Sequence, residues 1–204
     1  MRWRITSWLC AVALSAMGLG LSGCGREAAL PTTTLEELDK GDDGMRLKTS
    51  GALFDGYLVD YYTGAETNRL KSRSLIRSGK LNGLSEGWYA DGQQQVAEMF
   101  VDGKSHGVRL KWHNNGVKQA EDTIEHGELN GPCSKWHDNG QLAEEMTMIN
   151  GQADGQARSW HPDGSQKAEV ILKMGEVIEQ TFWEEGENPA GEAALAKREK
   201  TIRE

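Results

Sequence analysis

The feature that most constrains this chain is a repeat of 24 residues. Tryptophan recurs at this interval at Trp88, Trp112, Trp136 and Trp160. Three further columns keep the interval: Gly92, Gly116, Gly140 and Gly164; Gly103, Gly127, Gly151 and Gly175; and Ile76, Phe100, Ile124, Met148 and Leu172. A fixed period of this length indicates an array of stacked supersecondary units. Such arrays are usually surfaces for binding rather than reaction centres.

Each unit has the pattern of one β-hairpin. Apolar and basic side chains alternate along 107–112, which predicts a strand with one buried face. Asn114-Asn115-Gly116 follows, and Asn-Gly is a strong signal for a tight hairpin turn with a glycine at positive φ. A second strand is predicted from about Lys118 to Glu125, and the pair Gly127 and Gly131 then turns the chain into the next copy.

The sequence therefore predicts an all-β fold, an elongated single-layer antiparallel array of β-hairpins with short helical or disordered termini. Within the segment before the array, Thr34-Leu-Glu-Glu37 resembles a capping box and predicts one short helix that ends at Gly41. The predicted organisation is a signal peptide at 1–23, a lipidated Cys24 with a flexible tether at 24–50, the repeat domain at 51–186 with regular copies at 83–106, 107–130, 131–154 and 155–178, and a charged, alanine-rich tail at 187–204.

The tryptophans fit two interpretations. Indoles about 10 Å apart, two strand spacings, could form a stacking platform for sugars or a peptide. Alternatively, each indole fills its own layer of the core. Their alternation with Val108 and Leu110 favours the second interpretation and places the tryptophans on the inner face, together with the column that contains Ile124.

The residue after each tryptophan is aromatic or histidine, at Tyr89, His113, His137 and His161. Three histidines in register suggest a metal site. Equivalent residues of neighbouring copies are about 10 Å apart, however, whereas two nitrogen ligands of one zinc ion lie within about 3.5 Å of each other. We therefore expect no metal. These residues lie directly before the hairpin turn, a position that we call the hairpin shoulder. Strand alternation points their side chains to solvent there, so they are a candidate binding surface.

No pattern in the sequence predicts catalysis. Glu121, Glu145 and Glu169 recur once per copy, which favours cross-strand partners of Lys or Arg over a catalytic pair with divergent pKa values. Cys133 has no recognisable Cys–His–acid arrangement, and after loss of Cys10 and lipidation of Cys24 it has no partner for an internal disulfide. We therefore expect no enzyme activity, no cofactor and no small-molecule substrate.

The first residues predict where the protein is found. A basic start, Met1-Arg-Trp-Arg4, precedes an uncharged apolar run that ends in Leu21-Ser22-Gly23-Cys24. This ending resembles a bacterial lipobox, which implies cleavage before Cys24 and acylation of that residue. Two or more acyl chains hold a protein stably to a bilayer. We therefore expect a lipid-anchored protein of the cell envelope, in the outer membrane if the cell has two membranes.

Charge narrows the choice of partner. The full chain has 23 Lys and Arg against 31 Asp and Glu, a net charge of −8. Loss of residues 1–23 removes Arg2 and Arg4, which brings the net charge to −10. Such an acidic chain lacks the basic surface that neutralises phosphates, so we expect no nucleic-acid partner.

The repeat pattern also carries a family resemblance. A glycine, four residues and Trp-His-x-Asn-Gly, then a strand with an acidic residue and a Gly-x-x-x-Gly turn, resemble the MORN-repeat variant of bacteria and the YwqK-type antitoxin family. The resemblance covers about residues 51–186 and implies a MORN-like β-repeat fold. We expect a lipid-anchored envelope scaffold that binds an unknown protein, or a glycan. The alternative is an exported immunity protein that neutralises a toxin; an unrecognised enzyme is a third possibility.

Overall fold

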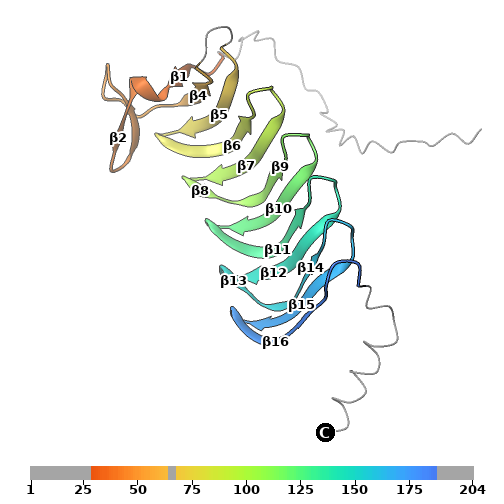
Figure 1. The fold of residues 1–204 in the computed structure, drawn as a ribbon. Helices are drawn as coiled ribbons and strands as arrows, with labels where there is room; N and C mark the ends of the chain where they lie inside the picture. Colours follow the sequence, from red (N-terminus) through yellow and green to blue (C-terminus); the bar gives the residue numbers. More distant parts are fainter. Residues whose placement is uncertain (1–28, 64–67, 188–204) are drawn as a thin grey trace, which may run out of the picture.

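A computed structural model describes residues 29–63 and 68–187 of the chain. The predicted signal peptide at 1–23, Cys24 and nearly all of the tail at 187–204 lie outside these ranges. Within them the prediction of an all-β hairpin array is confirmed, because the chain forms one long, mostly antiparallel sheet that runs along the molecule (Figure 1).

The main sheet contains fourteen strands, of which twelve follow one another in the order β1-β4-β5-β6-β7-β9-β10-β11-β12-β14-β15-β16. The short strands β8 and β13 pair with β7 and β12. The strands from β4 onward are β4 Gly56–Tyr61, β5 Leu70–Arg77, β6 Lys80–Trp88, β7 Gln94–Val101, β8 Lys104–Ser105, β9 Gly107–Trp112, β10 Lys118–Glu125, β11 Glu128–Trp136, β12 Leu142–Ile149, β13 Gln152–Ala153, β14 Gly155–Trp160, β15 Gln166–Lys173 and β16 Glu176–Phe182.

The tryptophans and the Ile124 column lie on opposite faces of this sheet, so the expectation of one shared inner face is wrong. In the β9–β10 pair, Ile124 is opposite Gly107, whereas Val108, on the side of Trp112, is opposite Thr123. The reason is a bulge in β10 between Lys118 and Ala120, which shifts the alternation by one residue. We call the side with the four tryptophans the tryptophan face and the side with Ile124 the inner face.

The buried residues of the sheet gather mainly on the inner face. Ile76 has no exposed surface and Ile124 is 4% exposed, whereas the repeat tryptophans Trp88, Trp112, Trp136 and Trp160 are only half-buried. Ala120, Cys133 and Ala168 are also buried on the inner face. The tryptophans are therefore not the most buried part of the sheet, which lies on the inner face at Ile76 and Ile124. The other members of that column, Phe100, Met148 and Leu172, are half-buried like the tryptophans.

Two kinds of turn join the strands. At the predicted hairpin turn, Gly116 donates its N–H to the carbonyl of His113, and its φ of 80° lies in the region that glycine tolerates best. The side chain of Asn115 accepts a hydrogen bond from the N–H of Val117, so Asn115 shapes the turn without adopting positive φ. The two-residue turn with positive φ at both positions occurs instead at the return end, as at His126 and Gly127.

The segment before the array is a folded cap, although the sequence suggested a flexible tether. Its elements are β1 Thr32–Thr34, η1 Leu35–Glu37, β2 Leu38–Gly41 and β3 Gly44–Leu47. The predicted helix is only the short 3-10 turn η1, because Thr34 makes no side-chain cap and Thr33 donates to Glu37 instead. Strand β1 pairs in parallel with β4 at the first edge of the main sheet.

Apolar contacts hold the cap on the end of the inner face. Leu38 and Phe54 pack with Ile76 in one buried cluster, and Met45 packs at its margin. Met45 also donates its backbone N–H to the carbonyl of Gly79, which joins the β2–β3 hairpin to the first return turn. The apolar residues of this otherwise polar segment thus become ordered because they cover Ile76, the first residue of the inner-face column.

Candidate interaction surfaces

A ladder of side-chain hydrogen bonds joins neighbouring copies at the hairpin shoulder. The ring of His113 bonds the carbonyl of Trp136 at 2.8 Å, and His137 bonds the carbonyl of Trp160 at 2.9 Å. The same contact recurs at both ends of the array. The further pairs are Tyr62 with Trp88 at 2.8 Å, Tyr89 with Trp112 at 2.7 Å and His161 with Trp183 at 3.1 Å.

This ladder assigns a structural role to Tyr89, His113, His137 and His161. A carbonyl oxygen only accepts, so the phenol of Tyr89 and the Nε2 of each histidine donate. The Nδ1 of His113 lies 3.4 Å from the side-chain amide nitrogen of Gln119. These side chains are half-buried and point along the array rather than freely into solvent. They are therefore poorly placed to form the predicted binding surface.

The return turns connect neighbouring copies in a second way. Each turn glycine donates its backbone N–H to a carbonyl one copy earlier, as from Gly127 to Ser105 at 2.8 Å and from Gly151 to Leu129 at 2.8 Å. Gly103 and Gly175 make the equivalent bonds. Each copy is thus hydrogen-bonded to the previous one at both ends of its hairpin, in addition to the strand pairing. This arrangement favours a continuous, semi-rigid surface.

Cationic side chains cover part of the tryptophan face. The ammonium of Lys118 lies 3.9 Å from the centroid of the Trp136 ring. The guanidinium carbon of Arg73 lies 5.9 Å from the ring of Trp88 and 5.6 Å from that of Tyr57. These are cation–π contacts, which stabilise the indoles in place. The indoles of Trp88 and Trp136 are thus each covered by a cationic side chain, which weakens the hypothesis of an open stacking platform.

The repeated glutamates also lie on the tryptophan face. Arg158 lies between Glu145 and Glu169, with each ion pair at 3.4 Å, and the register places these three residues on adjacent strands. The prediction of cross-strand partners is confirmed for this pair of glutamates. Glu121 differs, because it pairs with Lys118 on its own strand.

The exposed apolar surface of the tryptophan face is concentrated in its first copies. Leu84, Met99 and Val108 are 42%, 44% and 48% exposed, and Leu84 is directly opposite Met99. Two copies further on, the positions of Val108 and Met99 are occupied by Gln156 and Thr147. The apolar patch, defined here as Leu84, Met99 and Val108, is therefore a local feature and not a general property of the repeat.

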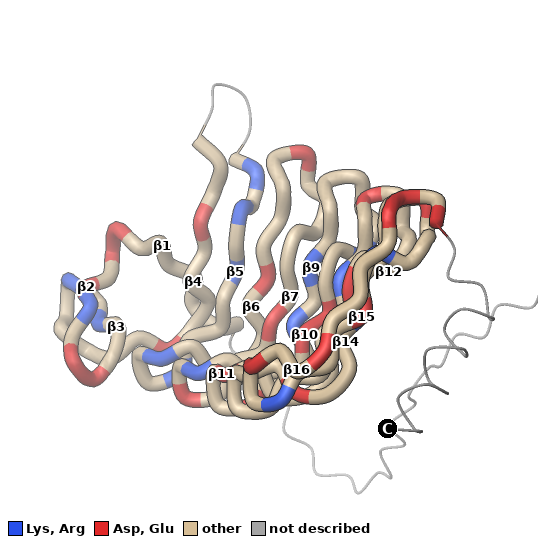
Figure 2. The backbone as a smooth tube through the Cα atoms, turned by 60° about the horizontal axis from the view of Figure 1, so that its bottom comes forward, with Lys and Arg blue, Asp and Glu red and all other residues tan. Residues whose placement is uncertain are grey.

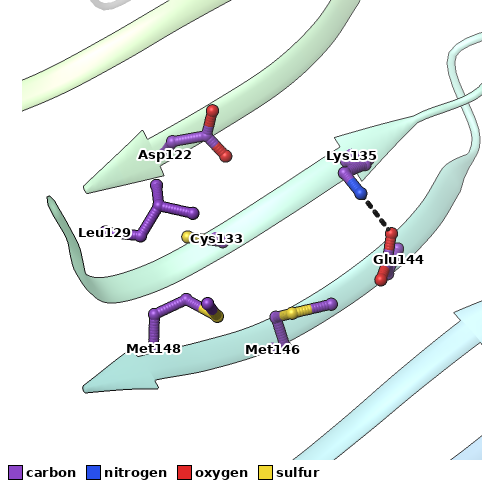
Figure 3. A pocket seen from close by; sticks show the side chains of 7 residues that line it. All are labelled: Asp122, Leu129, Cys133, Lys135, Glu144, Met146 and Met148. Atoms are coloured by element: carbon purple, nitrogen blue, oxygen red, sulfur yellow. Dashed lines mark hydrogen bonds and ion pairs between the residues drawn. The ribbon is translucent and has the colours of Figure 1, made fainter. Parts of the chain in front are cut away.

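The inner face contains a hollow of about 250 Å³ between β10, β11 and β12 (Figure 3). Its lining residues are Asp122, Leu129, Cys133, Lys135, Glu144, Met146 and Met148. Asp122 is 7% exposed and pairs with Arg109 at 2.8 Å. Burial raises the pKa of the Cys133 thiol, which favours its protonated, weakly nucleophilic form. The hydrogen bond to Glu144 raises the pKa of Lys135. The hollow thus contains satisfied charges and soft apolar groups.

The described ranges contain neither a cluster of metal-ligating side chains nor a membrane-spanning helix. No three His, Cys, Asp or Glu residues among 29–63 and 68–187 are grouped as metal ligands. His106 and His126 form a ring pair with centroids 5.5 Å apart at neighbouring return turns, without a third ligand. In the same ranges, no helix has the length and apolar character needed to cross a membrane.

Comparison with known proteins connects one copy to a family. The model for the MORN repeat variant matches residues 129–150, which contain most of β11 and all of β12. No curated protein matches the chain. The matched segment includes the ladder residues Trp136 and His137 and the turn residue Gly140, so one copy of the ladder position and of the hairpin turn lies in the part of the chain with a family match.

The sequence shows which positions repeat, but it does not show what two of these positions do. The ladder partner lies 23 residues ahead, and nothing in the period shows that a side chain and a backbone carbonyl are joined. The presence of either tyrosine or histidine at this repeat position does indicate a shared hydrogen-bond donor, because both can donate from the end of an aromatic ring. The apolar patch is also visible in the sequence, because polar residues replace Met99 and Val108 at the same positions two copies further on.

Proposed function

We propose that this chain is a lipid-anchored scaffold of the cell envelope that binds a protein partner through the tryptophan face. The observation that carries the proposal is the exposed apolar patch on a sheet whose copies are hydrogen-bonded to one another at both ends. A semi-rigid surface with a local apolar area fits recognition of another protein, since binding does not require much ordering of the scaffold.

The position of the patch supports a protein partner more than a glycan. Leu84, Met99 and Val108 are aliphatic or thioether side chains, whereas sugar recognition would depend on open aromatic rings. The indoles nearby are half-buried and partly covered by Arg73 and Lys118. A protein surface with its own apolar side chains would cover the patch, with the flanking ion pairs at its rim.

The envelope anchor in this proposal rests on Leu21-Ser22-Gly23-Cys24. With acyl chains on Cys24, the array would be held close to a bilayer. The folded cap begins shortly after Cys24, so the anchor would be followed by few residues before the structured array. This arrangement suits a partner that is itself in or near the membrane.

The test compares Met99→Asp with Thr147→Asp, its matched control two copies further on. Both place an aspartate at the same position of an exposed strand, but only Met99 belongs to the patch. The proteins are cross-linked in intact cells and purified from solubilised envelopes. The proposal expects one protein that is recovered with the wild type and with Thr147→Asp and lost with Met99→Asp. Recovery of the same partners by both variants would contradict it.

The identity of the partner then separates the scaffold from the immunity alternative. Recovery of an envelope-assembly protein supports the scaffold, and recovery of a secreted toxin supports immunity. The circular dichroism spectra of both variants must match that of the wild type, because an aspartate in a strand can also lower stability.

A further inference from the structure

The two ends of the sheet differ in how they are covered. At the first end, β1 pairs with β4 and the cap residues Leu38 and Phe54 cover the column at Ile76. At the other end, β16 is the last strand in the order and pairs with β15 on one side (Figure 1). Among residues 29–63 and 68–187, no strand pairs with the outer edge of β16. A repeat array needs a covered end to remain soluble.

The repeat shows what the outer edge of β16 can do. Glu176 lies 48 residues after Glu128, so β16 occupies the position that β11 has in an earlier copy. Strand β11 pairs with β10 on one side and with β12 on the other. Strand β11 pairs with β12 from Gly131 to Trp136, so the outer backbone groups in the later part of β16 correspond to groups that bond β12 in that copy. An added strand would satisfy them in the same way.

Apolar side chains on β16 are largely exposed. Val177, Ile178 and Phe182 are 54%, 63% and 65% exposed. Val177 is opposite Leu172 and Phe182 is opposite Ala168, so both extend the inner face beyond its last complete hairpin. An additional strand with apolar residues on that face would cover them.

Acidic residues accompany these apolar ones. Glu176 and Glu179 lie on the strand itself, and Glu184, Glu185 and Glu187 lie in the turn that follows, where Figure 2 shows a concentration of acidic positions. Glu184 occupies the shoulder position of His137 and His161, directly after a tryptophan. An ionised glutamate accepts hydrogen bonds and does not donate, so the ladder of donors ends at this residue.

The charges on this edge select among possible occupants. A second copy of β16 would bring glutamates opposite glutamates, which is unfavourable. After the turn, residues 189–196 are poor in β-branched and aromatic residues and have low strand propensity. The basic residues that follow, within 197–204, do not alternate with apolar ones. A strand from another protein, with basic side chains, complements the edge in both charge and hydrogen bonding.

We propose that β16 is a docking edge for an extended segment of a partner protein in which lysine or arginine alternates with apolar residues. The basic side chains pair with Glu176 and Glu179, and the apolar ones cover Val177 and Phe182 on the inner face. Alternate side chains of a strand point to opposite faces, so one segment meets both requirements. This edge is separate from the apolar patch, and the inference does not depend on the proposed function of that patch.

The experiment uses residues 24–204 with Cys24→Ser, which removes the acylation site and keeps every described residue. A fluorescent peptide of alternating lysine and valine is titrated and followed by anisotropy. A peptide of alternating glutamate and valine is the chemical control. Tight binding of the basic peptide alone, weakened by salt, is the expected result. Equal binding of the two peptides would overturn the proposal.

Two variants with equal net charge locate the binding. Glu176→Lys should weaken binding of the basic peptide about five- to tenfold, since an attractive cross-strand pair becomes repulsive. Glu128→Lys changes the same position of β11, which is paired on both sides, and should leave affinity within about twofold. Met99→Asp in the apolar patch should bind the peptide like the wild type. Equal losses in Glu176→Lys and Glu128→Lys would indicate only general attraction to an acidic protein and would overturn the docking edge.

Hydrogen exchange identifies the occupant. In the free chain, the outward-facing amides of β16 should exchange fast, and they should become protected when the basic peptide binds. Protection of these amides in the free, monomeric chain would show that the segment after residue 187 covers the edge. Protection that depends on protein concentration would show pairing of two copies. Either result would overturn the proposal of a partner strand.

Discussion

The Nε2 of His137 lies 2.9 Å from the carbonyl oxygen of Trp160, which is 23 residues further along the chain. The same bond is made from a tyrosine at Tyr89, where the acceptor is Trp112. A period of 24 residues therefore places a donor of one copy beside the backbone of the next. This contact explains why the column can hold either tyrosine or histidine, both of which donate from an aromatic ring.

The first prediction concerns this bond. His137→Phe keeps an aromatic ring and removes the donor, so it should lower the free energy of unfolding by about 1 kcal/mol. His137→Tyr should lose clearly less, because Tyr89 and Tyr62 already make the bond with a phenol. Urea unfolding of the two variants measures the difference. Equal stabilities for Phe and Tyr at this position would show that the bond contributes nothing.

The second prediction compares the two faces of the sheet. Ile124→Ala should lower the free energy of unfolding by about 2–5 kcal/mol, since Ile124 is 4% exposed and its removal leaves a cavity. Trp136→Ala should cost less, about 2 kcal/mol, because the half-buried indole loses only part of its contact with water on folding. Chemical denaturation measures both. A larger loss for Trp136→Ala than for Ile124→Ala would restore the tryptophans as the main core.

The third prediction concerns the cap. Leu38→Ala should lower the free energy of unfolding by about 2–3 kcal/mol, because Leu38 is 6% exposed in the cluster with Phe54 and Ile76. Leu35→Ala is the control. Leu35 is 67% exposed, so its replacement should change stability by no more than about 0.5 kcal/mol. If both substitutions were equally mild, residues 29–50 would behave as the flexible tether expected from sequence.

The fourth prediction concerns the proposed anchor. The wild-type chain should incorporate a fatty-acid probe and fractionate with membranes until detergent is added, because Cys24 follows Leu21-Ser22-Gly23. Cys24→Ser removes the acylated sulfur and should incorporate no probe. Cys133→Ser is the matched control and should be labelled like the wild type. Labelling of Cys24→Ser at the wild-type level would contradict the lipobox.

The sequence predicted the repeat, the hairpin turn at Asn115 and Gly116, and the all-β class, because these depend on local spacing and turn chemistry. It did not predict which face is buried. The bulge between Lys118 and Ala120 reverses the alternation of β10, and a bulge of one residue has no reliable signature in a single chain. The spacing alone therefore predicts one face for Trp112 and Ile124, although they lie on opposite faces of the sheet.

The candidate surfaces were less predictable than the fold. The shoulder residue His113 was expected to point to solvent, but its ring bonds the next copy, which only the three-dimensional register reveals. The cap was missed for a related reason. Leu38 and Met45 are isolated apolar residues in a polar segment, and their burial depends on Phe54 and Ile76, which are distant in sequence. Long-range contacts of this kind leave little local signal.

The most direct test of the array itself is a comparison of two deletions. Removal of residues 107–130 deletes one full period and joins His106 to Gly131, in place of the natural Gly107. Tyr89 can then donate to the carbonyl of Trp136 instead of Trp112, and the column continues from Phe100 to Met148. Removal of 107–118 deletes strand β9 and its turn but keeps most of β10, which reverses the direction of every later strand.

Urea unfolding followed by circular dichroism decides between the outcomes. We expect the deletion of 107–130 to give a cooperative transition, with a β spectrum and an m-value lower in proportion to the surface that is lost. We expect the protein with the deletion of 107–118 to be unfolded without urea, so that its unfolding curve has no folded baseline. Similar unfolding curves for the two deletions would contradict the account, because they would show that the period of 24 residues is not the structural unit.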